Sequence, residues 1–188
     1  MLKPLQEDGK YVEITGFKNV HVKDAEKFLQ AVRNGMPEEA EVQLFDADLI
    51  ASWQHLYFAV LNALMAFRTG RNISKSVAVE VMLYASAQRQ ITKAIELIGV
   101  KKTTANVAVV VVSKATESVK RALAAIVNCV GVEPDETVLE LSTRKVQRIR
   151  RAFAVSDLEL ETVASEGGAA EALIDLVVER VALLSTQL

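Results

Sequence analysis

The residues most able to bind a ligand are cationic side chains in the middle of the chain. Residues 68 to 102 carry seven Lys or Arg residues and two acidic ones, whereas the whole chain has a net charge of −2. Arg89 and Lys93 stand four residues apart on a predicted helix, where like charges repel unless a shared anion offsets the repulsion. Arg71 and Lys75 lie in the loop and first turn at the start of the helix predicted near 74–86. The N-terminal N–H groups of that helix also favour anions. Charge runs are more often solvated helical surfaces, and the alternative interpretation is a local anion site on an otherwise acidic protein.

Other chemistries lack the residue types that they need. The chain has two histidines and one cysteine, so it carries no His/Cys cluster with metal-ligand spacing. It has no glycine-rich phosphate loop and no nucleophile elbow. Asp46 and Asp48 flank a predicted strand-to-helix turn, where the electrostatics of a helix start explain them without catalysis. We expect no catalytic residue, metal, cofactor or small-molecule substrate, and a small enzyme with an unrecognised pocket is the rival hypothesis.

The elements that must position these side chains are mostly helices. Valine runs and short apolar runs predict strands near residues 11–17 (ending at Gly16), 42–45 and 106–112. Helical periodicity, cap residues and terminal glycines predict helices near 22–34, 52–68, 74–86, 89–98, 116–130, 143–153, 156–163 and 170–184. The length suits one domain. We therefore predict a helix-rich α+β fold, a single domain over residues 1–188 around a small mixed β-sheet, with a flexible turn at 165–168.

Compartment is inferred from apolar patterning and cysteine use. The sequence opens on charged residues without an apolar signal core. Its longest valine stretch, Val107 to Val112, is too short to span a bilayer. Cys129 stands in an apolar run and is expected to be a buried thiol without a disulfide partner, which suits a reducing compartment. We expect a cytoplasmic protein without membrane contact.

Residues 46 to 99 carry a resemblance to a known family. The segment contains His55-Leu56 with alanines following along the helix, Asn72-Ile73 before a helix that bears Glu80, and the run "YASAQRQI". It resembles the small tRNA-recruiting subunit of the KEOPS complex, the PRPK-binding protein family. The turn-plus-strand "PDETVLEL" and the final "VVERVALL" are also similar to that family, the latter to its archaeal members. Ala87 departs from the pattern, because the family often has glycine there.

The resemblance implies a non-catalytic accessory role in making threonylcarbamoyl-adenosine (t6A) in tRNA. Such a subunit binds the kinase-like ATPase subunit and captures the single-stranded 3′ CCA end of tRNA. The expected tRNA-binding residues are Arg71, Lys75, Arg89, Lys93 and His55, with a hydrogen-bonded, half-buried His55 as the equal alternative. The expected partner-binding residues are Ile95, Leu97 and Ile98, while Ile91 and Ala94 pack inward. A protein-only regulator of the ATPase is the alternative function, and the basic run from Arg144 to Arg151 has no assigned role.

Overall fold

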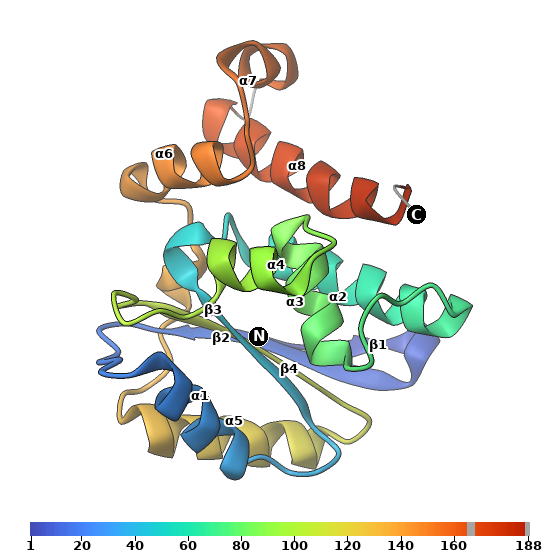
Figure 1. The fold of residues 1–188 in the computed structure, drawn as a ribbon, viewed down its shortest axis with the longest axis vertical. Helices are drawn as coiled ribbons and strands as arrows, with labels where there is room; N and C mark the ends of the chain where they lie inside the picture. Colours follow the sequence, from blue (N-terminus) through green and yellow to red (C-terminus); the bar gives the residue numbers. More distant parts are fainter. Residues whose placement is uncertain (165–167, 187–188) are drawn as a thin grey trace. The chain divides into compact units, whose positions relative to one another are not determined.

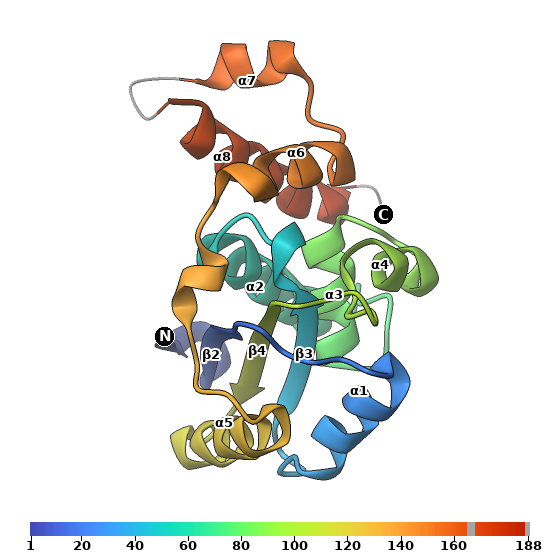
Figure 2. The ribbon, with the colours of Figure 1, turned by 90° about the vertical axis from the view of Figure 1, so that its left-hand side faces the viewer.

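The computed structural model describes residues 1–164 and 168–186, which fall into two compact units. The first unit comprises Met1–Ala47 and Gly99–Val138, and the second comprises Asp48–Ile98 and Leu139–Leu188. The first holds a β-sheet with two helices, and the second is built from helices (Figures 1 and 2). The predicted α+β fold is confirmed. Three residues of the predicted flexible turn, 165–167, lie outside the described residues.

Within the described residues, four strands form the sheet in the order β1-β2-β4-β3. Every neighbouring pair is antiparallel, with Thr15 opposite Val109 and Leu44 opposite the same valine. The sheet is therefore antiparallel rather than mixed, because no crossover helix joins two neighbouring strands in the same direction. The strands are β1 (Leu2–Leu5), β2 (Lys10–Phe17), β3 (Glu41–Asp46) and β4 (Val107–Ser113).

The valine-rich strand β4 and two amphipathic helices build the core of the first unit. All seven residues of β4 are buried, as the valine run predicts. Helices α1 (Ala25–Asn34) and α5 (Thr116–Val130) lie side by side against the sheet (Figure 1). The apolar residues of the two helices join the β4 valines in one cluster. Cys129 of α5 is exposed, contrary to prediction.

Gly16 lies inside β2 instead of ending it. A Cβ atom built on Gly16 would stand 2.0 Å from Cγ2 of Val138, so the absence of a side chain allows close packing. Val138 belongs to a 3-10 helix, η3 (Glu136–Leu139), which replaces the strand expected in "PDETVLEL". The sequence pattern also missed β1, a four-residue strand that contains Pro4. Short strands of this kind offer little periodicity to detect.

Polar caps set the helix boundaries of the second unit. The side chain of Ser52 accepts the N–H of His55 at the start of α2, and Ser156 with Glu159 forms the predicted capping box of α7. Ser76 caps α3, two residues after the predicted cap Ser74. The helices are α2 (Trp53–Thr69), α3 (Val77–Ser86), α4 (Ile91–Ile98), α6 (Thr143–Ala152), α7 (Asp157–Val163) and α8 (Gly168–Leu183), with 3-10 turns η2 (Ala47–Leu49) at the unit boundary and η4 (Leu184–Thr186) after α8.

Helix α2 packs against α3 and α8, and α6 and α7 also contact α8. Ile149 and Phe153 from α6 and its cap share an apolar cluster with the first half of α8. Across residues 1–164 and 168–186, no helix is both long and apolar enough to cross a membrane. The same residues contain no grouping of three or more His, Cys, Asp or Glu side chains suited to a metal ion.

Candidate functional site

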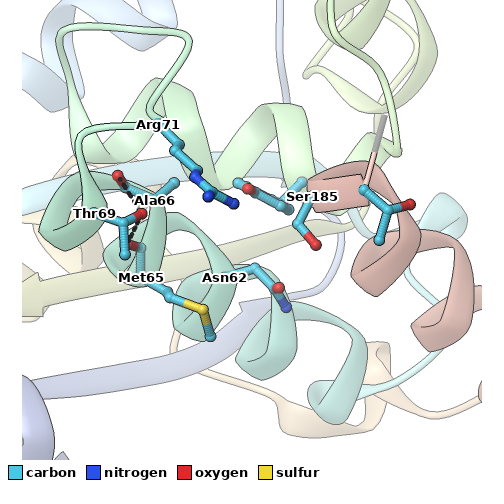
Figure 3. A pocket seen from close by; sticks show the side chains of 8 residues that line it. Asn62, Met65, Ala66, Thr69, Arg71 and Ser185 are labelled. Atoms are coloured by element: carbon cyan, nitrogen blue, oxygen red, sulfur yellow. Dashed lines mark hydrogen bonds between the residues drawn. The ribbon is translucent and has the colours of Figure 1, made fainter. Parts of the chain in front are cut away.

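A pocket of about 370 Å³ lies within the second unit, where the end of α2 meets α3 and η4. This volume is near the lower end of the range for small-ligand pockets, ~300–1,000 Å³. Asn62, Arg71 and Ser185 project around the same space from three separate chain segments (Figure 3). The full lining consists of Asn62, Met65, Ala66, Thr69, Arg71, Tyr84, Ser185 and Thr186. The site combines one cation, several polar groups and an apolar wall.

The backbone at the end of α2 fixes where Arg71 begins. Gly70 has a φ of 69°, in the left-handed region that glycine adopts without strain. The N–H of Arg71 then donates to the carbonyl of Ala66 at 2.9 Å, which is the long bond of a Schellman-type helix end. The pocket cation is therefore anchored at its backbone by the helix terminus.

A fully buried acidic side chain, Glu80 of α3, holds the loop that follows. Its carboxyl oxygens accept the N–H of Ile73 at 3.1 Å and the N–H of Ser74 at 2.7 Å. Asn72 adds a bond from its amide nitrogen to the carbonyl of Ser74 at 2.9 Å. A buried carboxyl group needs such donors, since burial without them is costly. Glu80 thus shapes the loop between Arg71 and α3 from below.

The three serine and threonine hydroxyl groups of the pocket present acceptors rather than donors. Thr69 donates its hydroxyl proton to the carbonyl of Met65 at 2.9 Å. Ser185 and Thr186 likewise donate to helix carbonyls three residues earlier, each at 2.8 Å. A hydroxyl has one proton and two lone pairs, so its oxygen remains an acceptor. The pocket therefore offers acceptor oxygens beside the guanidinium of Arg71, a combination that suits a ligand with amino or hydroxyl groups and an anionic group.

The predicted cations do not all meet in this pocket. Arg71 lines it, and Arg89 lies close enough to oppose the raised pKa of the lining residue Tyr84. That pKa is raised mainly by burial, with a further contribution from Glu80. Lys75 is exposed on the loop that Glu80 holds, and Lys93 is exposed on α4. Neither residue lines the pocket.

Arg89 precedes α4 instead of sharing its helix with Lys93. The helix begins at Ile91, and the carbonyl of Gln90 accepts the N–H of Ala94. The expected four-residue helical spacing of Arg89 and Lys93 is thus wrong. The turn arises because Ala87 ends α3 with a φ of 51°, a left-handed conformation that is costly for a residue with a Cβ. The same conformation explains why glycine suits this position.

His55 does not reach any surface where RNA could contact it. Its side chain is fully buried, Nδ1 accepts the N–H of Ala51, and Nε2 donates to the carbonyl of Ala85 at 2.7 Å. Burial, with a smaller contribution from Lys145, lowers the pKa of His55 to about 4. Phe153 packs edge-on against the ring. His55 is a neutral core histidine, which corrects its assignment to the tRNA-binding set.

Helix α4 exposes a different apolar face from the one predicted. Ile91 and Ile95 are 43% and 51% exposed and stand four residues apart, so they share one face. Leu97 is half-buried, whereas Ile98 is fully buried with Ala94. Ile98 therefore cannot present its side chain to a partner, and Ile91 takes its place beside Ile95. Sequence periodicity identified the helix but not which part of its broad apolar surface the second unit covers.

Sequence reasoning missed four polar residues of the pocket lining, Asn62, Thr69, Ser185 and Thr186. Ser185 and Thr186 lie in the C-terminal turn, more than a hundred residues from α2, and no local pattern links them to it. Thr69 stands directly before the helix-ending Gly70, a signal that marks the turn but not the pocket. The convergence of these residues is a property of the tertiary fold.

Comparisons with known proteins identify relatives of this chain. The family model described as "Kinase binding protein CGI-121" matches residues 17–185. The "Regulatory protein Cgi121" of Methanocaldococcus jannaschii is 34% identical over 113 residues, which cover 60% of this chain and 70% of the relative. The range matched by the family model includes the pocket lining up to Ser185 and all of α4.

Proposed function

Because the chain belongs to the CGI-121 family of kinase-binding proteins, we propose that it is a non-catalytic subunit of the KEOPS complex. In this role it binds the 3′ CCA end of tRNA and the kinase-like ATPase subunit, and so supports t6A modification by another subunit. The observation that carries the RNA part is the pocket of acceptor oxygens around Arg71. The exposed face of α4 supports the protein part.

The pocket chemistry favours the end of an RNA strand. Cytosine and adenine carry exocyclic amino groups, and a ribose carries hydroxyls, all of which donate to acceptor oxygens. Thr69, Ser185 and Thr186 present such oxygens. Arg71 supplies the cation that a phosphate needs, and its guanidinium suits phosphate geometry. An unpaired nucleotide at a single-stranded 3′ end can enter a pocket of about 370 Å³, whereas a base-paired stem is too wide.

The apolar face of α4 favours a protein partner. Ile91 and Ile95 are nearly half-exposed on one helix face. Association with another apolar surface would bury them, and each Å² of apolar area buried stabilises a complex by roughly 25 cal/mol. The kinase-like ATPase subunit is the partner we propose, with Ile91, Ile95 and Leu97 as the contact residues. Lys93 lies on the same short helix, which places cationic and apolar groups close together.

Binding of short RNA tests the first part. We expect a single-stranded RNA ending in CCA to bind the full chain more tightly than the same RNA ending in UUU, which lacks the amino donors. Arg71→Gln should weaken CCA binding about tenfold, since a charged hydrogen bond contributes ~1.5–3 kcal/mol. Arg33→Gln, an exposed arginine at the end of α1, is the matched control. Equal binding of the two RNAs would exclude capture of the CCA end.

Co-purification with the kinase-like subunit tests the second part. Ile95→Asp should abolish the complex while the free energy of unfolding changes by less than ~0.5 kcal/mol, because the position is exposed. Leu158→Asp on α7, where leucine is 74% exposed, is the matched control and should bind normally. A wild-type chain that binds the kinase-like subunit but no RNA would support the protein-only regulator instead.

A further inference from the structure

Helix α6 carries a row of arginines that the proposed function does not use. Arg144, Arg148 and Arg151 are exposed and spaced by four and three residues, which places them on one helix face. The opposite face buries Ile149 and the chain of Lys145. At 1.5 Å per residue the row spans about 10 Å, which corresponds to about three phosphates of a stacked strand at ~3.4 Å each.

A carboxylate from the start of the second unit orients two of these arginines. Asp48 lies 2.6 and 2.7 Å from Nη2 of Arg144 and 2.5 Å from Nη1 of Arg148. The Asp48 side chain is 12% exposed, whereas those of Arg144 and Arg148 are 65% and 45% exposed. One carboxylate between two guanidiniums leaves a net positive charge, and it holds both side chains in place before any ligand arrives. Such preorganisation lowers the entropic cost of binding.

The arginine row stands at one end of α8 and the pocket at the other. Ile149 of α6 packs in a cluster with Leu173 near the start of α8, whereas Ser185 lines the pocket just after its end (Figure 1). The twelve residues between Leu173 and Ser185 correspond to about 18 Å of helix, or about five nucleotides of a stacked strand. An RNA with about five single-stranded nucleotides at its 3′ end would therefore place its base-paired stem beside the arginine row.

We infer that Arg144, Arg148 and Arg151 form a second RNA contact, which binds phosphates of the base-paired stem adjoining the single-stranded 3′ end held in the pocket. The inference rests on the proposed function, because it takes that 3′ end to lie beside Arg71. The contact is to the backbone, so it is independent of stem sequence. An acidic protein surface is the rival occupant, and the experiment separates the two.

The test compares two RNAs on the full-length chain. One is a single-stranded oligonucleotide of about five nucleotides that ends in CCA, and the other is a hairpin whose stem carries the same nucleotides as a single-stranded 3′ end. The variant is R144Q/R151Q, in which Arg148 still pairs with Asp48, so the carboxylate keeps a partner. The control K27Q/K120Q removes two exposed charges from the first unit. Dissociation constants are measured across a salt series.

We expect R144Q/R151Q to weaken hairpin binding about two- to fivefold per arginine and to reduce the salt slope by about 0.9 per lost contact. Binding of the oligonucleotide should match that of the wild-type chain. Unchanged hairpin affinity and salt slope would overturn the inference. Loss of co-purification with the kinase-like subunit, with hairpin binding unchanged, would also overturn it, because the row would then contact a protein. Failure of the wild-type chain to bind the oligonucleotide would overturn the proposed function separately, because the arginine contribution is read from the hairpin.

Discussion

The chain has two basic regions, the first at residues 68–102 and the second at residues 144–151. In each region one acidic side chain holds its neighbours in place, but the groups that the acid binds differ. Near the pocket, Glu80 is fully buried and accepts backbone N–H groups of Ile73 and Ser74. Beside α6, Asp48 of η2 is largely buried, and its carboxylate pairs with the exposed guanidiniums of Arg144 and Arg148 themselves. The first acid sets the shape of a loop, and the second sets the position and net charge of side chains.

This difference teaches that a run of basic residues in a sequence can correspond to unlike surfaces. The cations of the segment from 68 to 102 lie on two helices, α2 and α4, and on the loops and turns around them, so their geometry depends on backbone hydrogen bonds. The segment from 144 to 151 stays on one helix, so its geometry follows from helical periodicity. Replacing the acid by its amide should therefore weaken RNA binding in the first region and strengthen it in the second.

The largest expected change in folding stability comes from protonation of His55, which packs against Phe153 at the end of α6, the helix of the second region. Its folded pKa of about 4 lies below the value of 6.5 in the unfolded chain. A lowered histidine pKa means that the neutral form stabilises the fold above pH 6.5 and that this stability is lost as pH falls from 6.5 towards 4. The loss approaches about 3 kcal/mol, at 1.36 kcal/mol per pKa unit. Urea unfolding at pH 7, 6 and 5 measures it.

His55→Gln is the control for this titration, because its amide can still donate and accept hydrogen bonds but does not titrate. The variant should be less stable at pH 7 and should lose the steep dependence between pH 6.5 and 5. Carboxyl groups with a lowered pKa, such as that of Glu159 at about 2, contribute at lower pH. An identical pH dependence in the variant and the wild-type chain would show that His55 is not the titrating group.

The next largest effect is expected for Glu80→Gln in the first region. The amide oxygen can still accept both N–H groups, as one carboxylate oxygen does now, but the buried amide NH2 then faces the N–H of Ile73 as a donor without an acceptor. The free energy of unfolding should fall by about 2 kcal/mol, within the ~1–3 kcal/mol cost of a buried unsatisfied group. The released loop should also weaken binding of the CCA-ending RNA, which fluorescence anisotropy measures.

Glu96→Gln makes the same change at an exposed position of α4 and should leave both quantities close to wild type. If Glu80→Gln lost stability but bound RNA as tightly as the wild-type chain, the loop would be structural and unrelated to the pocket. That result would remove the contrast between the two regions.

How far the sequence predicts these regions depends on whether the signal is local. The capping box at Ser156, the valine strand β4 and the helix end at Gly70 follow from neighbouring residues, and the structure contains all three. The antiparallel sheet with β1 at its edge depends on pairings of distant segments, which periodicity does not encode. Fold class was therefore predictable, and strand direction was not.

The candidate sites divide in the same way. Arg71 was predictable as a cation at a helix end, and α4 was predictable as an amphipathic helix. The burial of His55 and Ile98 was not, because both stand on apolar helices whose covered faces are decided by packing with other helices. Ser185 and Asp48 acquire their roles through segments more than ninety residues away. Charge in a sequence marks candidate surfaces, and tertiary contacts decide which groups share them.

A smaller effect of opposite sign on RNA binding is expected for Asp48→Asn in the second region. Loss of the carboxylate removes two ion pairs whose arginines are largely exposed, so the free energy of unfolding should fall by about 1 kcal/mol. The arginine row gains one net positive charge, and binding of the CCA-ending hairpin should tighten about two- to fivefold at low salt. Weaker hairpin binding would mean that Asp48 contributes more through orienting the arginines than it costs through its charge.

The smallest effect is expected for Ala87→Gly, at the turn that positions Arg89 in the first region. Ala87 has a φ of 51°, which costs an L-residue ~1–2 kcal/mol, while glycine loses ~0.5–1 kcal/mol in chain entropy. The variant should therefore be about 0.5 kcal/mol more stable, measured as a higher urea midpoint at an unchanged slope. Ala154→Gly, at the turn after α6 with the same φ, is the matched comparison. Stabilisation at both turns with unchanged RNA affinity would show that the first region depends on the Glu80 clamp rather than on strain at Ala87.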